Sequence, residues 1–341
     1  MISRIRKFDG RAFAERWLAA TGHVDAAGKV DANESISFGR ELEVVLAAPY
    51  DIDYLGTKAR TLVPFNTEIS NGAVSVTYKQ FDFVGQADFI TDYSSDFPSI
   101  EISGTESSTF FRSIGASYGY SVQDLREAQL AGRPLDAMKA KRAREAIERK
   151  IEIVACQGDA LRNLSGLANQ SAVTVITQGS TAGLSGVAWL PSGGGTATPP
   201  QIFADLAFAF KTIFDTTLTI VESDTVVFPT KIMSYLKSTL FRPGFSSETL
   251  LQVILAANPW IKHVDVWPYL DHMGADTKGR ILVYKRDPKF LEFMLSQDFE
   301  TFPPVMQGML MTVNCHARIG GVQLRYPRSM IYLDGCGGTD A

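Results

Sequence analysis

The longest helical pattern in the chain lies between residues 134 and 157. Apolar side chains recur there at spacings that place them on one face of a helix, while charged residues fill the rest of its circumference. The apolar positions are Leu135, Met138, Ile147, Ile151 and Val154. Pro134 suits the first turn of such a helix and Gly158 suits its end. The pattern therefore predicts a helix over residues 134–157, about 35 Å long at ~1.5 Å per residue.

Between residues 61 and 105 the pattern changes to that of strands. The dipeptide Asn71-Gly72 lies between two segments of high β-propensity and predicts a hairpin there. Apolar or aromatic residues alternate with polar ones in this segment, and the alternation changes phase once. The candidate contact residues are these apolar positions together with one lysine between them: Val74, Val76, Tyr78, Lys79, Phe81 and Phe83. A two-stranded ribbon does not bury a core by itself. We therefore expect these six side chains to contact another molecule, in particular another copy of the chain.

Shorter segments of both kinds fill the rest of the chain. Residues 1–40 are polar and rich in Ala and Gly, which predicts an arm with one short helix at 11–20, and a second short helix is expected at 41–48. A strand is expected at 107–120, followed by a helix that begins after Ser121.

A passage rich in Gly, Ser, Thr and Pro at 179–200 predicts a linker or mobile loop, with a domain boundary near residue 195. Beyond it, helices and strands alternate in an α/β or α+β pattern, and strands return at 308–335. The expected helices are 201–214, 231–240 and 247–257, and the expected strands are 225–228, 261–266 and 280–284.

Composition and charge narrow the class of protein. The chain has 341 residues, of which 45% are hydrophobic and 21% charged, so it is not disordered as a whole. A formal net charge of −4 does not indicate a sequence-specific nucleic-acid binder. Three widely spaced cysteines indicate neither a disulfide framework nor a cysteine metal site. We see no signal peptide and no membrane span, and expect a soluble protein made in the cytoplasm.

Candidate chemistry is sparse. His263, Asp265, Asp271 and His272 could hold zinc or manganese, although such residues are also common at a strand edge and a polar turn. Asp92, Asp96 and Glu101 form an acidic stretch that lacks the regular spacing of a calcium loop. No segment matches a phosphate-binding loop or a nucleophile elbow. We therefore assign no catalytic, cofactor-binding or metal-binding residue. A ligand-binding or enzymatic role for residues 197–300 stays as a competing hypothesis.

Several stretches, in order along the chain, resemble the major capsid proteins of tailed bacteriophages, which have the Hong Kong 97-like fold. They are RELEVVLAAPYDIDYLGTKARTLVPFNTE, YKQFDFVGQADFI, SIGASYGYSVQDLREAQLAGRPLDAMKAKRAREAIERK with the later GLAN, and ARIGGVQLRYPRSMIYLDG. The resemblance covers roughly residues 38 to 335 and favours an α+β fold. It implies an N-terminal arm at 1–40, a peripheral domain at 41–60 and 106–196 with a spine helix at 134–157, an extended E-loop at 61–105, an axial domain at 197–300, and strands at 301–341 that return to the peripheral domain.

The resemblance also implies a function and partners. It predicts a structural protein, not an enzyme, that assembles into pentamers and hexamers of an icosahedral shell around the genome, in the virion, after assembly in the bacterial cytoplasm. Partners would be other copies of the chain, a portal, a separate scaffolding protein and, in some relatives, a decoration protein, with no membrane. Some relatives join subunits by a lysine–asparagine bond; Lys79 is the candidate donor here, but no matching acceptor is found. An encapsulin-like bacterial nanocompartment, which shares the fold, is the alternative.

Overall fold

The computed structural model describes residues 56–337, except 86, 90–96, 98, 131–134, 192–193, 243, 246 and 276–277. The chain divides into two units, 1–55 and 56–341, and all described residues belong to the second. The expected arm at 1–40 and the expected helices at 11–20 and 41–48 lie outside the described residues.

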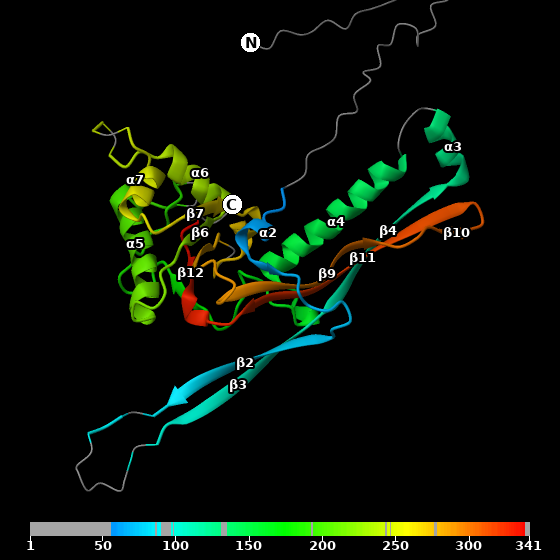
Figure 1. Ribbon diagram of the computed structural model, residues 1–341. Helices are drawn as coiled ribbons and strands as arrows, with labels where there is room; N and C mark the ends of the chain where they lie inside the picture. Colours follow the sequence, from blue (N-terminus) through cyan, green and yellow to red (C-terminus); the bar gives the residue numbers. More distant parts are fainter. Residues whose placement is uncertain are drawn as a thin grey trace, which may run out of the picture. The chain divides into compact units, whose positions relative to one another are not determined.

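The second unit contains α-helices, strands and short 3-10 helices (Figure 1). The helices are α2 (Ala59–Leu62), α3 (Val122–Leu130), α4 (Leu135–Gln157), η1 (Ala160–Arg162), α5 (Pro199–Thr216), α6 (Thr230–Ser238), α7 (Leu250–Ala257), η3 (Pro268–His272) and η5 (Pro327–Ser329). The strands are β1 (Phe65–Asn66), β2 (Ser75–Val84), β3 (Glu101–Phe110), β4 (Arg112–Ser121), β5 (Thr174–Thr177), β6 (Thr225–Phe228), β7 (His263–Val266), β8 (Ile281–Tyr284), β9 (Leu291–Thr301), β10 (Val305–Gln307), β11 (Leu310–Leu324) and β12 (Met330–Asp334). No helix among the described residues is both long and apolar enough to cross a membrane.

The first sheet carries the long helix α4. Its strand order is β1-β9-β11-β10, and β4 pairs with β11 in antiparallel register from Arg112 opposite Ile319 to Ser121 opposite Leu310. Helix α4 packs on β4, β11 and β9 (Figure 1). Its residues Ile147, Ile151 and Val154 are buried in the core beneath it. The predicted helix at 134–157 is thus confirmed, because a regular apolar stripe is a strong local signal.

Gly158 ends α4 for a conformational reason. Its φ of +72° lies in the left-handed region, which favours glycine. A Cβ at this position would lie 2.4 Å from the carbonyl oxygen of Leu164. The chain reverses immediately, and the backbone N–H of Asp159 donates to the same carbonyl at 2.8 Å.

The second sheet, β5-β12-β8-β6-β7, has a core on each face. In β6, Val226 and Phe228 face the core that contains α5, α6 and α7, whereas Val227 faces the core that contains α4. The same alternation occurs in β8 and β12. Short strands whose residues are all buried are those expected between two covering layers.

Two buried carboxylates connect segments that are distant in sequence. Glu152 of α4 accepts the backbone N–H groups of Lys58 and Ala59 at 2.8–3.0 Å and the indole N–H of Trp267 at 2.6 Å. This carboxylate therefore joins the start of α2 and the segment before η3 to the long helix.

Asp205 of α5 has an equivalent role on the other side of the second sheet. It accepts hydrogen bonds from Gln178, from the backbone and hydroxyl of Ser185, and from the indole of Trp189 at 2.6–2.9 Å. Trp189 is fully buried. The expectation of a linker at 179–200 is therefore wrong for the described residues, because one buried carboxylate and one tryptophan hold this Gly/Ser-rich passage against α5.

Three other expectations about strands need correction. Asn71-Gly72 does form a turn, closed by the bond from the Ala73 N–H to the Ser70 carbonyl at 3.0 Å, but the strands on either side belong to different sheets. The strand expected at 107–120 is two strands, β3 and β4, separated by Phe111. The strands of 308–335 do not all complete one sheet: β11 lies in the first and β12 in the second. The same topology places β9, from the segment 197–300, in the first sheet.

Candidate inter-subunit surface

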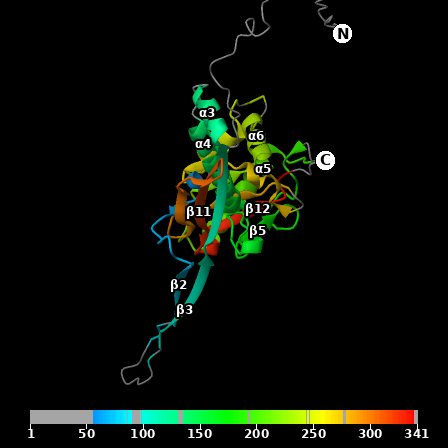
Figure 2. The same ribbon diagram turned by 90° about the vertical axis from the view of Figure 1, so that its right-hand side faces the viewer.

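The antiparallel ribbon of β2 and β3 extends away from the two sheets (Figure 1, and turned by 90° in Figure 2). Its register is continuous, from Ser75 opposite Phe110 to Val84 opposite Glu101. Side chains in these strands are exposed, except for three partly buried ones near the base, at Val76, Tyr78 and Thr109. The described part of the chain thus leaves most of both faces of the ribbon uncovered.

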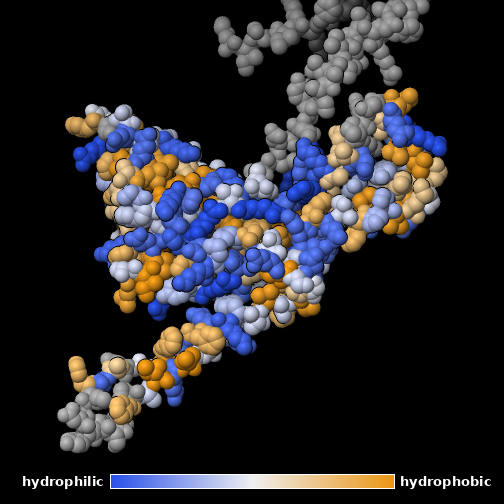
Figure 3. Space-filling model, viewed as in Figure 1, coloured by the Kyte–Doolittle hydropathy of each residue, from blue (hydrophilic) through white to orange (hydrophobic). Residues whose placement is uncertain are grey.

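One face of the ribbon is apolar in its outer half. Because side chains alternate along a strand, Lys79, Phe81 and Phe83 share a face with the residues opposite them, Glu106, Gly104 and Ile102. Phe81, Phe83 and Ile102 are 65%, 73% and 64% exposed. We call these three residues the ribbon patch. Figure 3 shows hydrophobic residues gathered along the ribbon.

The inner part of the same face is polar. Lys79 forms an ion pair with Glu106 at 3.0 Å, and both side chains are more than half exposed. The ring of Phe81 lies over the backbone of Gly104, where an added Cβ would be 3.5 Å from the ring. Exposed aromatic groups beside a charged pair can bind a partner through an apolar centre and a polar rim.

The base of the ribbon is fixed to the first sheet. Arg318 of β11 donates to the carbonyls of Asn71 and Ala73, the latter at 3.0 Å, and the Ser296 hydroxyl donates to the carbonyl of Ser70 at 2.9 Å. Phe111, between β3 and β4, is 5% exposed, and Gly320 leaves room for its ring. The ribbon is therefore held at its root, while no described part of the chain covers its outer half.

The six residues predicted as contacts all lie on the ribbon or at its base. Val74 is exposed beside the joint, where its carbonyl accepts the Phe111 N–H at 2.9 Å. Val76 and Tyr78 point to the face opposite the ribbon patch. Sequence reasoning missed Ile102, because it placed the hairpin turn at Asn71-Gly72 and so did not identify β3 as the partner of β2. Alternation of Ile102 with polar neighbours was the available signal.

The residues considered for metal binding have other contacts. Asp265 pairs with Lys58, and the Asp271 carboxylate accepts the backbone N–H of Thr230 at 2.7 Å, at the start of α6. Within the described ranges, no three potential ligands of the His, Cys, Asp and Glu types come together. Glu101 lies at the exposed start of β3, whereas Asp92 and Asp96 fall outside the described residues.

All three cysteines are buried and free. Burial raises the pKa of the thiols of Cys156, Cys315 and Cys336 above the ordinary value. Thiols in this state are poor nucleophiles.

Comparison with known proteins identifies relatives of this fold. A family model described as "Major capsid protein" matches residues 85–336. The capsid of Myoviridae phage XM1 is similar with a TM-score of 0.74 at 16% identity, over 89% of this chain and 99% of that one. The capsid of an empty GTA particle is similar with a TM-score of 0.60 at 11% identity, over 91% and 100% of the two chains.

A virus-like particle from Pyrococcus furiosus is similar with a TM-score of 0.52 at 11% identity, over 81% of this chain and 91% of that one. No curated protein matches the sequence. The structural similarities establish a shared α+β fold.

Proposed function

Because this chain belongs to the major capsid protein family, we propose that many copies of it build the icosahedral shell of a tailed double-stranded DNA bacteriophage. The copies associate as pentamers and hexamers, and the shell encloses the genome. The observation that carries the proposal is the family match over residues 85–336, which includes β3, α4 and both sheets. Similarity to the capsid of phage XM1 supports the choice of a phage shell.

The ribbon supports assembly on physical grounds. Three large apolar side chains are each about two-thirds exposed to water, which is unfavourable. This unfavourable exposure is removed when another surface covers them. Burial contributes roughly 25 cal/mol per Å² of apolar area, so covering them stabilises an interface by several kcal/mol. The described part of the chain leaves them exposed, and a neighbouring copy would cover them in a closed shell.

The proposal also covers the domains of the subunit, its assembly partners and the compartment where it assembles. The domain bounds inferred from the sequence assign the ribbon to an E-loop, α4 to a peripheral domain and most of 197–300 to an axial domain. The shell would be assembled in the host cytoplasm with a separate scaffolding protein and a portal, and decoration proteins would bind in some shells. Its role is structural and involves no sequence-specific contact with DNA.

A compartment shell of the encapsulin type is the alternative, and the fold similarity to the particle from Pyrococcus furiosus is the observation on its side. The family match favours the phage shell. Particles purified from the native source distinguish the two, because a phage shell contains DNA and a compartment contains a cargo protein.

The test of assembly uses the two faces of the ribbon. In the triple variant Phe81→Ser, Phe83→Ser and Ile102→Ser we expect soluble subunits that form no shells, because interface anchors of this kind contribute about 2 kcal/mol or more each. Sedimentation and negative-stain electron microscopy measure the loss. The matched control is Gln80→Ser with Thr105→Ser, a cross-strand pair on the opposite face, and it should assemble. Normal shells from the triple variant would contradict the proposal.

A further inference from the structure

One end of the second sheet brings four strand ends together. The registers place Tyr284, the last residue of β8, opposite Met330 at the start of β12 and opposite Thr225 at the start of β6. Thr225 in turn pairs with His263, the first residue of β7. Neighbouring strands lie ~4.8 Å apart, so the four ends span about 14 Å. Residues just outside these ends are therefore neighbours, although they come from separate segments of the sequence.

Six basic residues flank these strand ends: Lys262, Lys285, Arg286, Lys289, Arg325 and Arg328. Backbone hydrogen bonds hold their segments together. The Lys285 N–H donates to the Ser329 carbonyl at 3.2 Å, which joins the end of β8 to the start of β12. Asp224 accepts the Arg286 N–H on its carboxylate and the Lys262 N–H on its backbone carbonyl, both at 2.8 Å. The basic residues thus belong to one continuous surface.

Only two of these six charges are neutralised by an ion pair within the described residues. Lys285 pairs with Asp224 at 3.1 Å, and Arg325 pairs with Glu292 at 2.6 Å. The other four side chains form no ion pair in the part of the chain that the structure describes, and three of the four are exposed. We call these four residues the basic row: Lys262, Arg286, Lys289 and Arg328.

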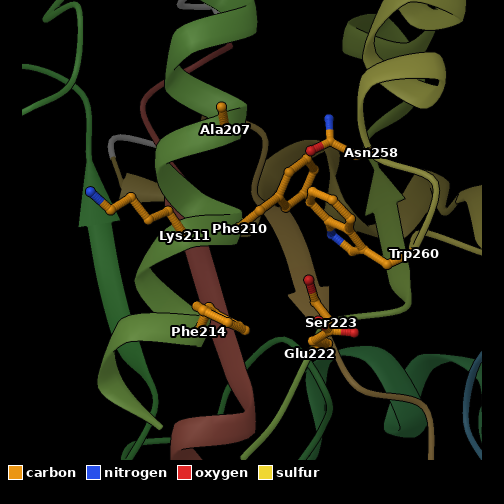
Figure 4. A pocket seen from close by; sticks show the side chains of 8 residues that line it. All are labelled: Ala207, Phe210, Lys211, Phe214, Glu222, Ser223, Asn258 and Trp260. Carbon is orange, nitrogen blue, oxygen red and sulfur yellow. The ribbon is translucent and has the colours of Figure 1, made fainter. Parts of the chain in front are cut away.

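Acidic residues next to the basic row do not cancel its charge. Asp287 is partly buried, and its carboxylate accepts the Lys289 backbone N–H at 2.8 Å. Glu222 lines a pocket of about 360 Å³ to which Lys211 of α5 also contributes (Figure 4). Asp215 lies 3.9 Å from the same lysine. This end of the sheet therefore keeps an excess of positive charge, although the whole chain has a formal net charge of −4.

One end of the basic row lies at a second pocket, of about 300 Å³, which Arg328 and Thr174 line together with the end of α5. Among the described residues, neither the Arg328 guanidinium nor the Thr174 hydroxyl has a hydrogen-bond partner. A guanidinium and a hydroxyl are donors that suit phosphate oxygens. The dipole of α5 also favours a cation at this helix end, but it does not account for Lys262 on the far side of the sheet.

We propose that the basic row binds phosphates of the DNA inside the shell, without regard to base sequence. The inference rests on the proposed function, which places this polyanion next to every copy. Duplex DNA carries one negative charge per ~1.7 Å of its axis, so a row about 14 Å wide can meet several phosphates. Each copy contributes a weak contact, and many copies together hold the genome against the shell.

The test measures binding of a short labelled DNA duplex of arbitrary sequence to the full-length protein by fluorescence anisotropy. If all four side chains contact phosphates, the logarithm of the association constant should fall with the logarithm of salt concentration with a slope of about −3.6. Replacing the four residues by Gln should bring the slope close to zero and weaken binding about tenfold or more at about 50 mM salt.

A matched control removes two lysines and two arginines that are exposed elsewhere, on α4 and α6, and so has the same net charge. The control substitutions are Lys141→Gln, Arg144→Gln, Arg149→Gln and Lys237→Gln. This variant should keep the slope of the wild type. An equal loss of binding in both variants would overturn the inference, because net charge alone would then explain it.

Single substitutions test the pocket at the end of the basic row. Arg328→Gln should reduce the magnitude of the slope by about 0.9, because one phosphate contact is lost. Thr174→Val should weaken binding about threefold and leave the slope unchanged, because a hydroxyl is neutral. A slope that Arg328→Gln does not alter would remove this residue from the proposed contact.

The remaining outcomes separate this inference from the proposed function. If polyglutamate binds the basic row and DNA does not displace it, the row serves an acidic protein segment and the inference is wrong. If the wild type forms shells but shows no DNA binding that depends on the row, the inference fails and the shell function stands. If the wild type binds DNA through the row but never assembles, the proposed function fails instead.

Discussion

Some residues find their interaction partners within the described fold, and others do not. Glu152 and Asp205 are buried, and their carboxylates accept hydrogen bonds from several segments. In contrast, Phe81, Phe83 and Phe245 are large apolar side chains that the described part of the chain leaves exposed. Both kinds of residue are costly unless a partner is found. The buried carboxylates find hydrogen-bond donors within the fold. We propose that the exposed apolar side chains are covered by other copies of the chain.

The carboxylate of Asp224, next to the second sheet, makes the stability of the protein depend on pH. Burial by itself raises the pKa of its carboxyl, but hydrogen bonds outweigh burial and leave this pKa below the ordinary value. The donors are the Arg286 backbone N–H at 2.8 Å, the Thr225 hydroxyl at 2.9 Å and the Lys285 ammonium at 3.1 Å. A group whose pKa is lowered on folding stabilises the protein above its unfolded pKa of about 3.9, and this stabilisation is lost as pH falls through the folded value.

We therefore expect Asp224→Asn to lower the free energy of unfolding at pH 7, and the difference from wild type to shrink below about pH 4. Urea unfolding of subunits kept unassembled by the ribbon-patch substitutions measures it. Asp215→Asn is the control. Its carboxylate is exposed, and its contact with the Lys211 ammonium is long, at 3.9 Å. An undiminished difference at low pH would mean that the carboxylate charge is not the cause.

At the scale of elements, local patterns were reliable and pairing was not. The helix expected at 134–157 is α4 at Leu135–Gln157, and the short helices and strands between 199 and 284 lie within a few residues of their expected bounds. Ser121 also begins α3 as expected, because its hydroxyl accepts the Gln123 N–H at 3.0 Å. The hairpin expected at Asn71-Gly72 is an example of a wrong pairing. The turn forms locally, but the partner of β2 is a strand 17 residues beyond its end.

The end of α4 gives a prediction at this scale. Gly158→Ala would place a Cβ 2.4 Å from the Leu164 carbonyl oxygen in a left-handed backbone conformation, so we expect it to lower the free energy of unfolding by about 2 kcal/mol or more. Thermal unfolding of unassembled subunits measures the change. The matched control is Gly72→Ala, where an added Cβ meets no atom within 4 Å. Equal melting temperatures for the two variants would contradict this explanation of the helix end.

At the scale of the molecule, the second unit is well packed around two cores yet presents uncovered apolar groups at separate places. The ribbon patch and the loop before α7 belong to different parts of the chain. Neither exposed group contributes hydrophobic stabilisation to an isolated subunit. In the closed shell that we propose, neighbouring copies would cover the ribbon patch without new secondary structure, which is why we place the function in the assembly.

The same scale yields a prediction about covalent linkage. Lys79, the candidate donor for a bond between subunits, is paired with Glu106 of its own ribbon at 3.0 Å, and the strand region Cys315-His316-Ala317 supplies no carboxylate to assist the reaction. We expect mature shells boiled in SDS under reducing conditions to run as a single monomer band. Bands at multiples of the monomer mass would show that subunits are covalently joined.

The sequence by itself determined the long helix, most of the short helices and strands, and the resemblance to capsid proteins. These depend on apolar periodicity and on runs of residues, which are local properties. Only the tertiary structure decided that β3 pairs with β2, that β12 joins the second sheet, and that Asp205 holds the 179–200 passage in place. Contacts of this kind depend on which distant segments meet, and neither periodicity nor composition records that.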